Sequence, residues 1–249
     1  MIMDKNIPQT EQLYQKSKPI DHLSMSEGIM LMVNEQKKAA LEVGKSINSI
    51  ELAINQIYDH LVLNAKGRLI YVGAGTSGRI GVQDGVELFP TFNWPKHRLE
   101  YILAGGNKAI FNAIENAEDD TLKAVEATSE RFINSQDVVI GLAASGNTPF
   151  TCKVMEEARK KGALTIAISN NPEGHILKFG QVQIILDTKE ELISGSTRLK
   201  AGTAQKICLN IISSMVMTKM GRVRNGTMSH MVPTNKKLRH RKLRINDHF

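Results

Sequence analysis

Apolar residues in the first quarter of the chain recur at intervals of three and four, the spacing of one face of a helix. Ser24 and Glu27 form a capping-box pattern before an apolar stretch, which predicts that a helix begins near Ser24. A second amphipathic helix is predicted to end near Gly67, and its apolar positions step by three and four: Ile47, Ile50, Ile54, Ile57 and Leu61. We therefore expect the N-terminal part to be helical.

From residue 69 onward, short apolar runs alternate with stretches of helical periodicity. The apolar runs predict strands at residues 69–72, 99–103, 138–142, 164–168 and 182–186. Helices are predicted at 77–88, 107–132, 149–161 and 199–220. Strands separated by helices form a parallel sheet that is covered on both faces. Ligands of such sheets bind at the carboxyl ends of the strands.

Three stretches place glycines beside Ser or Thr hydroxyls near a predicted helix start. They are Gly-Ala-Gly-Thr-Ser-Gly-Arg at 73–79, Ala-Ala-Ser-Gly-Asn-Thr-Pro at 143–149, and Ser-Gly-Ser-Thr-Arg-Leu-Lys-Ala-Gly-Thr-Ala-Gln-Lys at 194–206. Glycine lets the backbone approach a ligand, and hydroxyls and unpaired N–H groups at a helix start donate to anions. The three stretches together predict a phosphorylated small molecule as the ligand.

The first stretch also has the G-x-G-x-x-G spacing of a dinucleotide-binding loop, with Gly73, Gly75 and Gly78. Such a loop requires an acidic residue about 20 positions further on, at the end of the next strand. Here that strand is followed by Ala-Gly-Gly at 104–106, and Glu100 lies near its start instead. A nicotinamide or flavin site is therefore disfavoured. The sequence also lacks the G-x-x-x-x-G-K-[ST] pattern of a P-loop.

Composition sets limits on the class of protein. The 249 residues can bury one sizeable core, and 41% hydrophobic and 23% charged residues are ordinary for a globular chain. No apolar run approaches the roughly 18 residues of a membrane span, and the polar residues 1–15 do not resemble a secretion signal. Cys152 and Cys208 are the only cysteines, which disfavours a disulfide framework or a structural zinc site. We expect a protein of the reducing cytoplasm, without a membrane partner.

The net charge of +7 is concentrated at the C-terminus. Residues 236–249 contain six Lys or Arg and one Asp, a local charge of +5, which leaves +2 for the rest of the chain. Such a cluster can contact nucleic acid or an anionic surface. A solvated terminal helix face explains it more simply, and we expect no nucleic-acid partner.

Four motifs resemble those of the N-acetylmuramic acid 6-phosphate etherases, a branch of the sugar isomerase (SIS) domain proteins. They lie at 69–79, 116–119, 141–149 and 195–206, in the family's order, and the resemblance extends from about residue 20 to 238. It implies a flavodoxin-like SIS sheet of five parallel strands flanked by helices, a homodimer, and no metal or organic cofactor. The implied segments are N-terminal helices at 1–66, the SIS domain at 67–225 and a basic, helical tail at 226–249.

The family reaction, a step in N-acetylmuramic acid catabolism and cell wall recycling, removes D-lactate from the 3-ether of N-acetylmuramic acid 6-phosphate. It leaves N-acetylglucosamine 6-phosphate. The resemblance places the proton donor at Glu87, beside the apolar residues Val86, Leu88 and Phe89, and the second carboxylate, the base, at Glu118. On an unbroken helix Glu87 would lie about 15 Å from Ser77. Either the helix breaks early, near Pro90, or Glu87 serves a site completed by other loops, including loops of a second subunit.

The hydroxyl-bearing loops are expected to hold the sugar phosphate. In SIS proteins the Ser-Gly-x-Thr loop does so, which implies Ser145, Asn147 and Thr148 here. Further candidates for the phosphate or the sugar hydroxyls are Thr76, Ser77, Arg79, Ser196, Thr197 and Lys200. Arg198 and Lys200 fit a helix-start ion pair equally well. His175 and His230 have no metal-ligand spacing, and we expect no metal site.

Some positions depart from the family pattern. Asn107 stands where the family has Glu, Gly85 and Val86 replace small residues before Glu87, and residues 225–238 match least well. Two other functions keep the phosphate loops. A sugar-phosphate-sensing SIS regulator would not need both Glu87 and Glu118, and an aldose–ketose phosphate isomerase would need no proton donor at a C3 ether.

Overall fold

A parallel sheet forms the centre of the computed structural model, which describes residues 7–233 and 239–240. Within the described residues its strands are β1 (Leu69–Gly73), β2 (Leu99–Leu103), β3 (Val138–Ala143), β4 (Leu164–Ser169) and β5 (Val182–Ile185). Their order is β2-β1-β3-β4-β5, and every neighbouring pair is parallel. The predicted five-stranded SIS-type α/β fold is therefore confirmed: each apolar run forms a strand, and β1, β3 and β4 are buried along their whole length.

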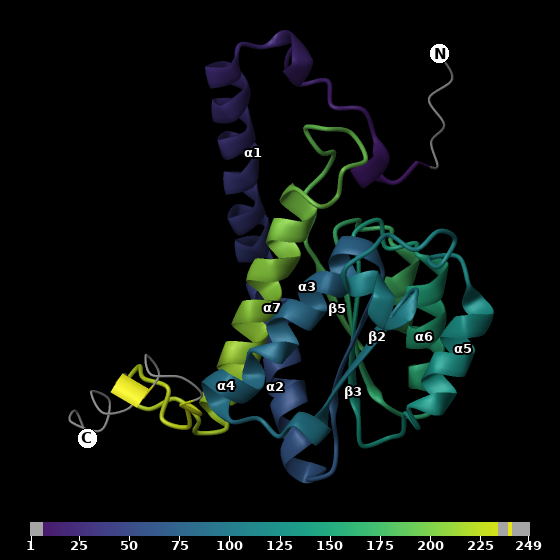
Figure 1. Cartoon of the computed structure of the whole chain (residues 1–249), viewed down its shortest axis with the longest axis vertical. Coiled ribbons are helices and arrows are strands. Elements are labelled where there is room, and N and C mark those ends of the chain that lie inside the picture. Colours follow the sequence, from purple (N-terminus) through teal and green to yellow (C-terminus); the bar gives the residue numbers. More distant parts are fainter. Residues whose placement is uncertain (1–6, 234–238, 241–249) are drawn as a thin grey trace.

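Helices cover both faces of the sheet (Figure 1). One face packs against α2 (Ile47–Leu63), α3 (Gly75–Val86) and α7 (Lys200–Lys219), and the other against α5 (Thr121–Glu130) and α6 (Pro149–Lys160). Each face has its own cluster of buried apolar side chains. Short 3-10 helices occupy the connections, at Gln9–Glu11, Ile20–His22, Lys96–Arg98, Gly106–Ile110 and His175–Phe179.

Helix α1 (Met25–Lys45) lies along α7 and extends beyond the sheet (Figure 1). It begins with the predicted capping box, in which the Glu27 N–H donates to Ser24 Oγ over 3.4 Å and the Ser24 N–H donates to Glu27 Oε2 over 2.9 Å. Much of its apolar surface is not covered within the chain, and its exposed large side chains are Met25, Ile29, Met30, Val33 and Leu41. A single chain thus leaves several large apolar side chains of α1 in contact with solvent.

The helix predicted at 77–88 is present as α3 but ends two residues earlier, and the helix predicted at 107–132 forms only in part. Helix α3 ends at Val86 and α4 (Leu88–Phe92) follows; the break is at Glu87, and Pro90 lies inside α4. The stretch 107–132 contains a 3-10 turn and an irregular segment before α5. Asn116 adopts φ 57°, a left-handed conformation that interrupts a helix, and the Asp120 carboxylate caps α5 by accepting the Lys123 N–H.

The predicted basic, helical tail is not helical in its first part. Residues 226–233 contain turns, and residues 234–238 and 241–249, which carry most of the basic cluster, lie outside the described residues.

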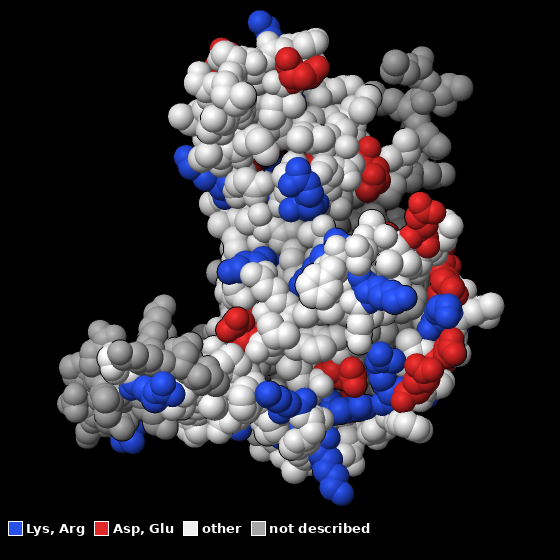
Figure 2. All heavy atoms as spheres, in the orientation of Figure 1, with Lys and Arg blue, Asp and Glu red and all other residues white. Residues whose placement is uncertain are grey.

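On the face seen in Figure 2, Lys and Arg side chains are scattered among Asp and Glu side chains. Within the described residues no helix is long and apolar enough to cross a membrane.

Candidate active site

The order of the strands places a topological switch point between β1 and β3, the position at which open α/β sheets form a ligand crevice. The chain leaves β1 toward α3 on one face of the sheet and leaves β3 toward α6 on the opposite face. Ligands of open α/β sheets bind where two such connections diverge. Two of the glycine-hydroxyl stretches, 73–79 and 143–149, lie at this point. The crevice is therefore the candidate active site.

The loop after β1 brings α3 against the end of its own strand. A Cβ atom on Gly73 would lie 2.8 Å from the Cα atom of Gly78, so this close start requires glycine at both positions. Helix α3 begins at Gly75, and no side chain of the described residues caps it. The first N–H groups of a helix lack partners inside the helix and attract anions. The first turn also contains Thr76, which is partly exposed, and Ser77, which is buried.

The carboxylate of Glu118 lies beside the start of α3. A Cβ atom on Gly75 would be 3.0 Å from Glu118 Oε1. The Glu118 backbone is fixed from the other side of the crevice, because the Phe150 N–H in the first turn of α6 donates to the Glu118 carbonyl over 2.9 Å. Glu118 therefore bridges the starts of α3 and α6. Its side chain is exposed, so a molecule in the crevice can reach the carboxylate.

The loop after β3 is held by the segment that follows β4. The Ile176 N–H donates to the Gly146 carbonyl over 2.8 Å, and the Asn171 side chain donates to the Ser145 carbonyl over 3.0 Å. The Asn147 side-chain oxygen accepts the His175 N–H over 3.0 Å, so this predicted ligand already has a structural bond. Ser145 Oγ accepts the Asn147 N–H over 3.2 Å, which leaves its hydroxyl proton available to a phosphate oxygen. Thr148 precedes α6 and forms no side-chain cap among the described residues.

The third stretch contains the start of the helix predicted at 199–220. Helix α7 starts at Lys200, and the buried Glu191 carboxylate accepts the Lys200 N–H over 3.1 Å and the Ala201 N–H over 2.7 Å. Burial raises the pKa of Glu191 above its usual value, while these backbone hydrogen bonds oppose the rise. An internal carboxylate thus occupies the place at the start of α7 where an external anion was expected.

The side chain of Lys200 is buried in an ion pair. Its ammonium group lies 2.9 Å from Glu35 Oε2 and donates to the Glu190 carbonyl over 2.9 Å, and only 1% of the side chain is exposed. Lys38 and the Tyr14 hydroxyl also donate to Glu35. Burial opposes ionisation of Glu35, but the hydrogen bonds from the two lysines lower its pKa to about 2. Lys200 was expected either to contact the phosphate or to form an ion pair at the helix start. The structure contains the ion pair, and we do not include Lys200 in the proposed phosphate site.

Ser196 and Thr197 precede α7 beside the first turn of α3. A Cβ atom on Gly202 would lie 3.3 Å from both the Thr197 carbonyl oxygen and Thr76 Cγ2, so the two helix starts are close together. Both predicted ligands are partly exposed. The loop 194–199 therefore borders the crevice even though the start of α7 is capped.

Arg79 is bound to backbone carbonyl groups. Its Nε donates to the carbonyls of Ala109 and Ile110 over 2.9 and 3.2 Å, and Nη2 donates to the carbonyl of Asn112 over 2.9 Å. The guanidinium group thereby holds the segment that leads to Glu118. In this structure Arg79 acts on the crevice indirectly, by holding that segment in place. A contact between Arg79 and phosphate would have to use N–H groups of the guanidinium that are not bonded to these carbonyls.

Glu87 lies at the junction of α3 and α4, at the end of α3 remote from the crevice, and its side chain is exposed. Ten residues of helix separate it from Ser77, a distance of about 15 Å. The apolar surroundings expected for Glu87 are not formed within one chain, because Leu88 turns into the core and Val86 is 50% exposed. One chain therefore does not bring Glu87 and Glu118 together.

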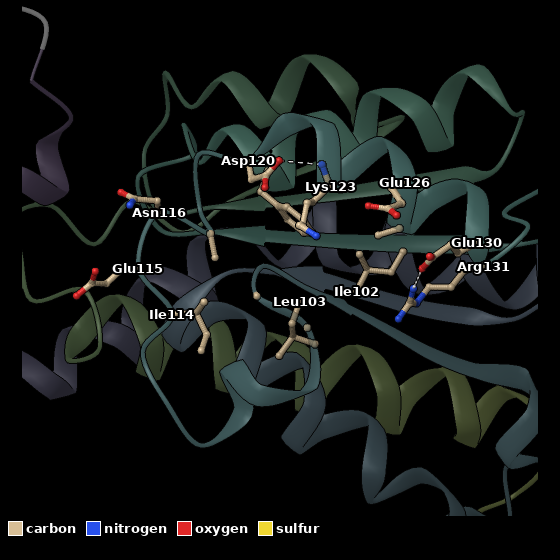
Figure 3. A pocket seen from close by; sticks show the side chains of 15 residues that line it. Ile102, Leu103, Ile114, Glu115, Asn116, Asp120, Lys123, Glu126, Glu130 and Arg131 are labelled. Atoms are coloured by element: carbon tan, nitrogen blue, oxygen red, sulfur yellow. Dashed lines mark hydrogen bonds and ion pairs between the residues drawn. The ribbon is translucent and has the colours of Figure 1, made fainter.

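A separate groove of about 520 Å³ lies between the end of β2 and α5 (Figure 3). Glu115 and Asn116 lie at one end, and Glu130 and Arg131 at the other. None of the predicted site residues lines it. We place the site in the crevice rather than in this groove, because the crevice contains the uncapped helix start and the carboxylate of Glu118. Within the described residues, no group of His, Cys, Asp and Glu could hold a metal ion.

Known proteins resemble the chain along nearly its whole length. Family models for the glucokinase regulatory protein N-terminal SIS domain and for the SIS domain match residues 50–159 and 120–215. An N-acetylmuramic acid 6-phosphate etherase of Symbiobacterium thermophilum is 41% identical over 243 residues, which cover 98% of this chain and 80% of the relative. One of Clostridium acetobutylicum is 43% identical over 239 residues, covering 96% and 78%. The chain belongs to the N-acetylmuramic acid 6-phosphate etherase family.

Solved structures agree at the level of the fold. A protein of Escherichia coli CFT073, solved as a ligand complex, has a TM-score of 0.58 at 14% identity, with 82% of this chain and 97% of that chain covered. The sugar isomerase domain of an RpiR transcription factor from Sphaerobacter thermophilus has a TM-score of 0.53 at 13% identity, covering 87% and 98%. The etherase family thus shares its sheet with proteins of other functions, a transcription factor among them.

Two buried carboxylates were not predicted as part of this region. Glu191 caps α7, and Asp84, one turn before Glu87, accepts hydrogen bonds from β1 and α7. The only sequence signal for a buried Asp84 is its place among the glycines of a helix, and this signal is weak. Glu191 lies outside the pattern of a local helix cap, so nothing in the sequence marks its role.

Proposed function

We propose that this protein cleaves the D-lactyl ether of N-acetylmuramic acid 6-phosphate, giving N-acetylglucosamine 6-phosphate and D-lactate. The observation that carries the proposal is 41–43% identity, over nearly the whole chain, to etherases of that name. The position of Glu118 supports it, because a carboxylate beside an uncapped helix start is suited to act next to a bound phosphate.

The chemistry requires one carboxylate and one carboxylic acid. In the open-chain sugar the C2 proton lies next to the C1 aldehyde and is acidic enough for Glu118 to remove. The C3–O bond then breaks, and its electron pair leaves with the lactyl oxygen, which takes a proton from Glu87. Water adds across the resulting C2=C3 double bond, with its oxygen on C3 and a proton on C2. The two groups must therefore begin in opposite protonation states.

The phosphate is proposed to lie at the carboxyl ends of β1 and β3. The hydroxyls of Ser145, Thr148, Thr76 and Ser77 are the proposed donors, together with the uncapped N–H groups at the start of α3. Asn147 contributes its side-chain amide, and Ser196 and Thr197 approach from the loop before α7. Hydrogen bonds to a charged phosphate are stronger than those between neutral groups.

The complete site is proposed to form in a homodimer. Glu87 is too far from the crevice of its own chain, so Glu87 of the partner subunit would complete the pair with Glu118. The exposed apolar side chains of α1 supply a surface for association. Light scattering should give about twice the 27.6 kDa mass of one chain. A monomer that retains activity would contradict the two-subunit site.

Assay of D-lactate from N-acetylmuramic acid 6-phosphate tests the proposal directly. In H₂¹⁸O the product should gain ¹⁸O at C3, and in D₂O it should gain deuterium at C2. Formation of a ketose phosphate without lactate would indicate an isomerase. Binding of the sugar phosphate without turnover would indicate a sensor.

We further propose a cytoplasmic enzyme that needs no metal or organic cofactor. Lactate release should then be unaffected by EDTA and by extensive dialysis. Loss of release that an added divalent cation restores would overturn the cofactor-free mechanism.

A further inference from the structure

Asp84 is a buried carboxylate without a cationic partner. Its residue is 5% exposed, and no ion pair of the described residues involves it. Three neutral donors surround it: the Tyr71 hydroxyl at 2.8 Å, the Asn210 side-chain amide at 2.7 Å and the Ser213 hydroxyl at 3.0 Å. Burying a charge without a counter-charge costs free energy that a neutral side chain would avoid.

These three bonds fix the last turn of α3 between two other elements. Tyr71 belongs to β1, and Asn210 and Ser213 belong to α7. A carboxylate accepts at both oxygens and so satisfies all three donors, whereas an amide in its place would keep the bond to Tyr71 only if the Tyr71 hydroxyl turned to accept instead of donate. The charge also strengthens each bond.

Helix α3 needs such an anchor because four of its 12 residues are glycine. Glycine in a helix interior is less favourable than alanine by about 1 kcal/mol. The missing side chains allow close packing instead, since a Cβ atom on Gly81 would lie 3.1 Å from Tyr71 Cβ and one on Gly85 would lie 2.6 Å from the Tyr101 hydroxyl. Tertiary contacts therefore determine where this helix ends.

We propose that Asp84 is a positioning residue for Glu87. Glu87 follows Asp84 by three residues and terminates α3, so the bonds of Asp84 set the place and direction from which Glu87 reaches the substrate. The inference rests on the proposed etherase function, in which Glu87 donates the proton to the departing lactyl oxygen.

Two stacked tyrosines offer a matched pair of variants. The rings of Tyr71 and Tyr101 stack with centroids 6.1 Å apart. The Tyr71 hydroxyl bonds to Asp84, whereas the buried Tyr101 hydroxyl has no hydrogen-bond partner among the described residues. Tyr71→Phe and Tyr101→Phe therefore remove the same group from similar places, and only the first loosens Asp84.

The test compares two readouts in the wild type, Asp84→Asn, Tyr71→Phe, Tyr101→Phe and Glu87→Gln. D-Lactate release requires both carboxyl groups, whereas exchange of the substrate C2 proton in D₂O requires Glu118 alone. Asp84→Asn should lower release by about 10–100-fold, because a misplacement of about 1 Å can cost 10²-fold. Exchange and KM should stay within about threefold. Tyr71→Phe should lower release by about 2–10-fold, the effect of one hydrogen bond, and Tyr101→Phe should change neither readout.

Other outcomes overturn the inference. Parallel losses of exchange and release in Asp84→Asn would show a general structural role, and unchanged release would show no role. If Asp84→Asn does not fold, the two tyrosine variants decide. Equal D-lactate release by Tyr71→Phe and Tyr101→Phe would then overturn the positioning role of Asp84. Absence of lactate release from the wild type would instead overturn the proposed function. A selective loss in Glu87→Gln without one in Asp84→Asn would leave that function standing and reject the positioning role.

Discussion

The starts of α3 and α7 are composed of similar residues, yet they offer different groups to a ligand. Both combine glycines, hydroxyls and a cation within a few positions. At α3 the first turn lacks a side-chain cap among the described residues and faces Glu118 from the next connection. At α7 the buried Glu191 carboxylate already accepts two N–H groups, and Lys200 is paired with Glu35. The neighbours of a helix start, rather than its own residues, decide whether it can bind an anion.

The largest effect is expected from Glu118→Gln. Removal of the base should lower C2 proton exchange and D-lactate release by about 10²–10⁴-fold, the usual contribution of general base catalysis. Exchange is followed by NMR in D₂O and release by a coupled lactate assay. The matched variant at the other helix start is Glu191→Gln, in which exchange should stay within about threefold. Equal losses of C2 proton exchange in Glu118→Gln and Glu191→Gln would contradict the view that only the start of α3 belongs to the active site.

Next in size is a loss of stability from Glu35→Gln. This change leaves the buried ammonium group of Lys200 without its counter-charge, which typically costs about 3–5 kcal/mol of unfolding free energy. Urea unfolding at one fixed protein concentration measures the difference. Lys38→Met is the control, because Lys38 pairs with the same carboxylate but is 45% exposed and should cost about 1 kcal/mol or less. A cost for Glu35→Gln no larger than that of the control would contradict the role assigned to the Lys200 pair.

A smaller effect is expected on binding from Ser145→Ala. Loss of a hydrogen bond to a charged phosphate should weaken binding of N-acetylglucosamine 6-phosphate by about 1–3 kcal/mol in titration calorimetry. Ser194→Ala is the control in the α7 stretch, because the Ser194 hydroxyl accepts the Tyr14 N–H at the N-terminal segment. Its affinity should be unchanged. Unchanged affinity in Ser145→Ala would remove that loop from the phosphate site.

The sequence predicted the sheet well because its signals are local. Each strand is an apolar run bounded by polar or glycine residues, and the start of α1 is determined by Ser24 and Glu27, three positions apart. The prediction failed at 107–132, where helical periodicity continued through a segment that Asn116 and the cap at Asp120 divide. Local periodicity was present there, but the backbone conformation at a few residues decided the structure.

The site was less predictable because its contacts join distant parts of the chain. The motifs predicted ligand-binding loops and Glu118, and the structure brings those after β1 and β3 together with Glu118. They did not predict that Lys200 meets Glu35 from α1, or that Arg79 meets carbonyls of the segment after β2. Neither contact has a sequence spacing that could be recognised. The separation of Glu87 from Glu118 likewise follows from the direction of α3.

The smallest predicted effect is a pH dependence of the unfolding free energy. It arises from Glu35, the ion-pair partner of Lys200 at the start of α7. Hydrogen bonds from Lys38 and Lys200 lower the pKa of Glu35 to about 2 from its ordinary value of 4.5, even though burial acts in the opposite direction. A carboxyl group whose pKa is lowered by folding stabilises the protein fully above its unfolded-state pKa, and this contribution is lost as the pH falls toward the folded-state pKa. The unfolding free energy of the wild type relative to Glu35→Gln should therefore fall by about 0.7 kcal/mol between pH 5 and pH 4. Other carboxyl groups contribute similarly to both proteins and cancel in this difference. Urea unfolding of the two proteins at both pH values measures it. A difference that stays constant, or grows as the pH falls, would mean that the lysines do not hold Glu35 ionised in the folded protein.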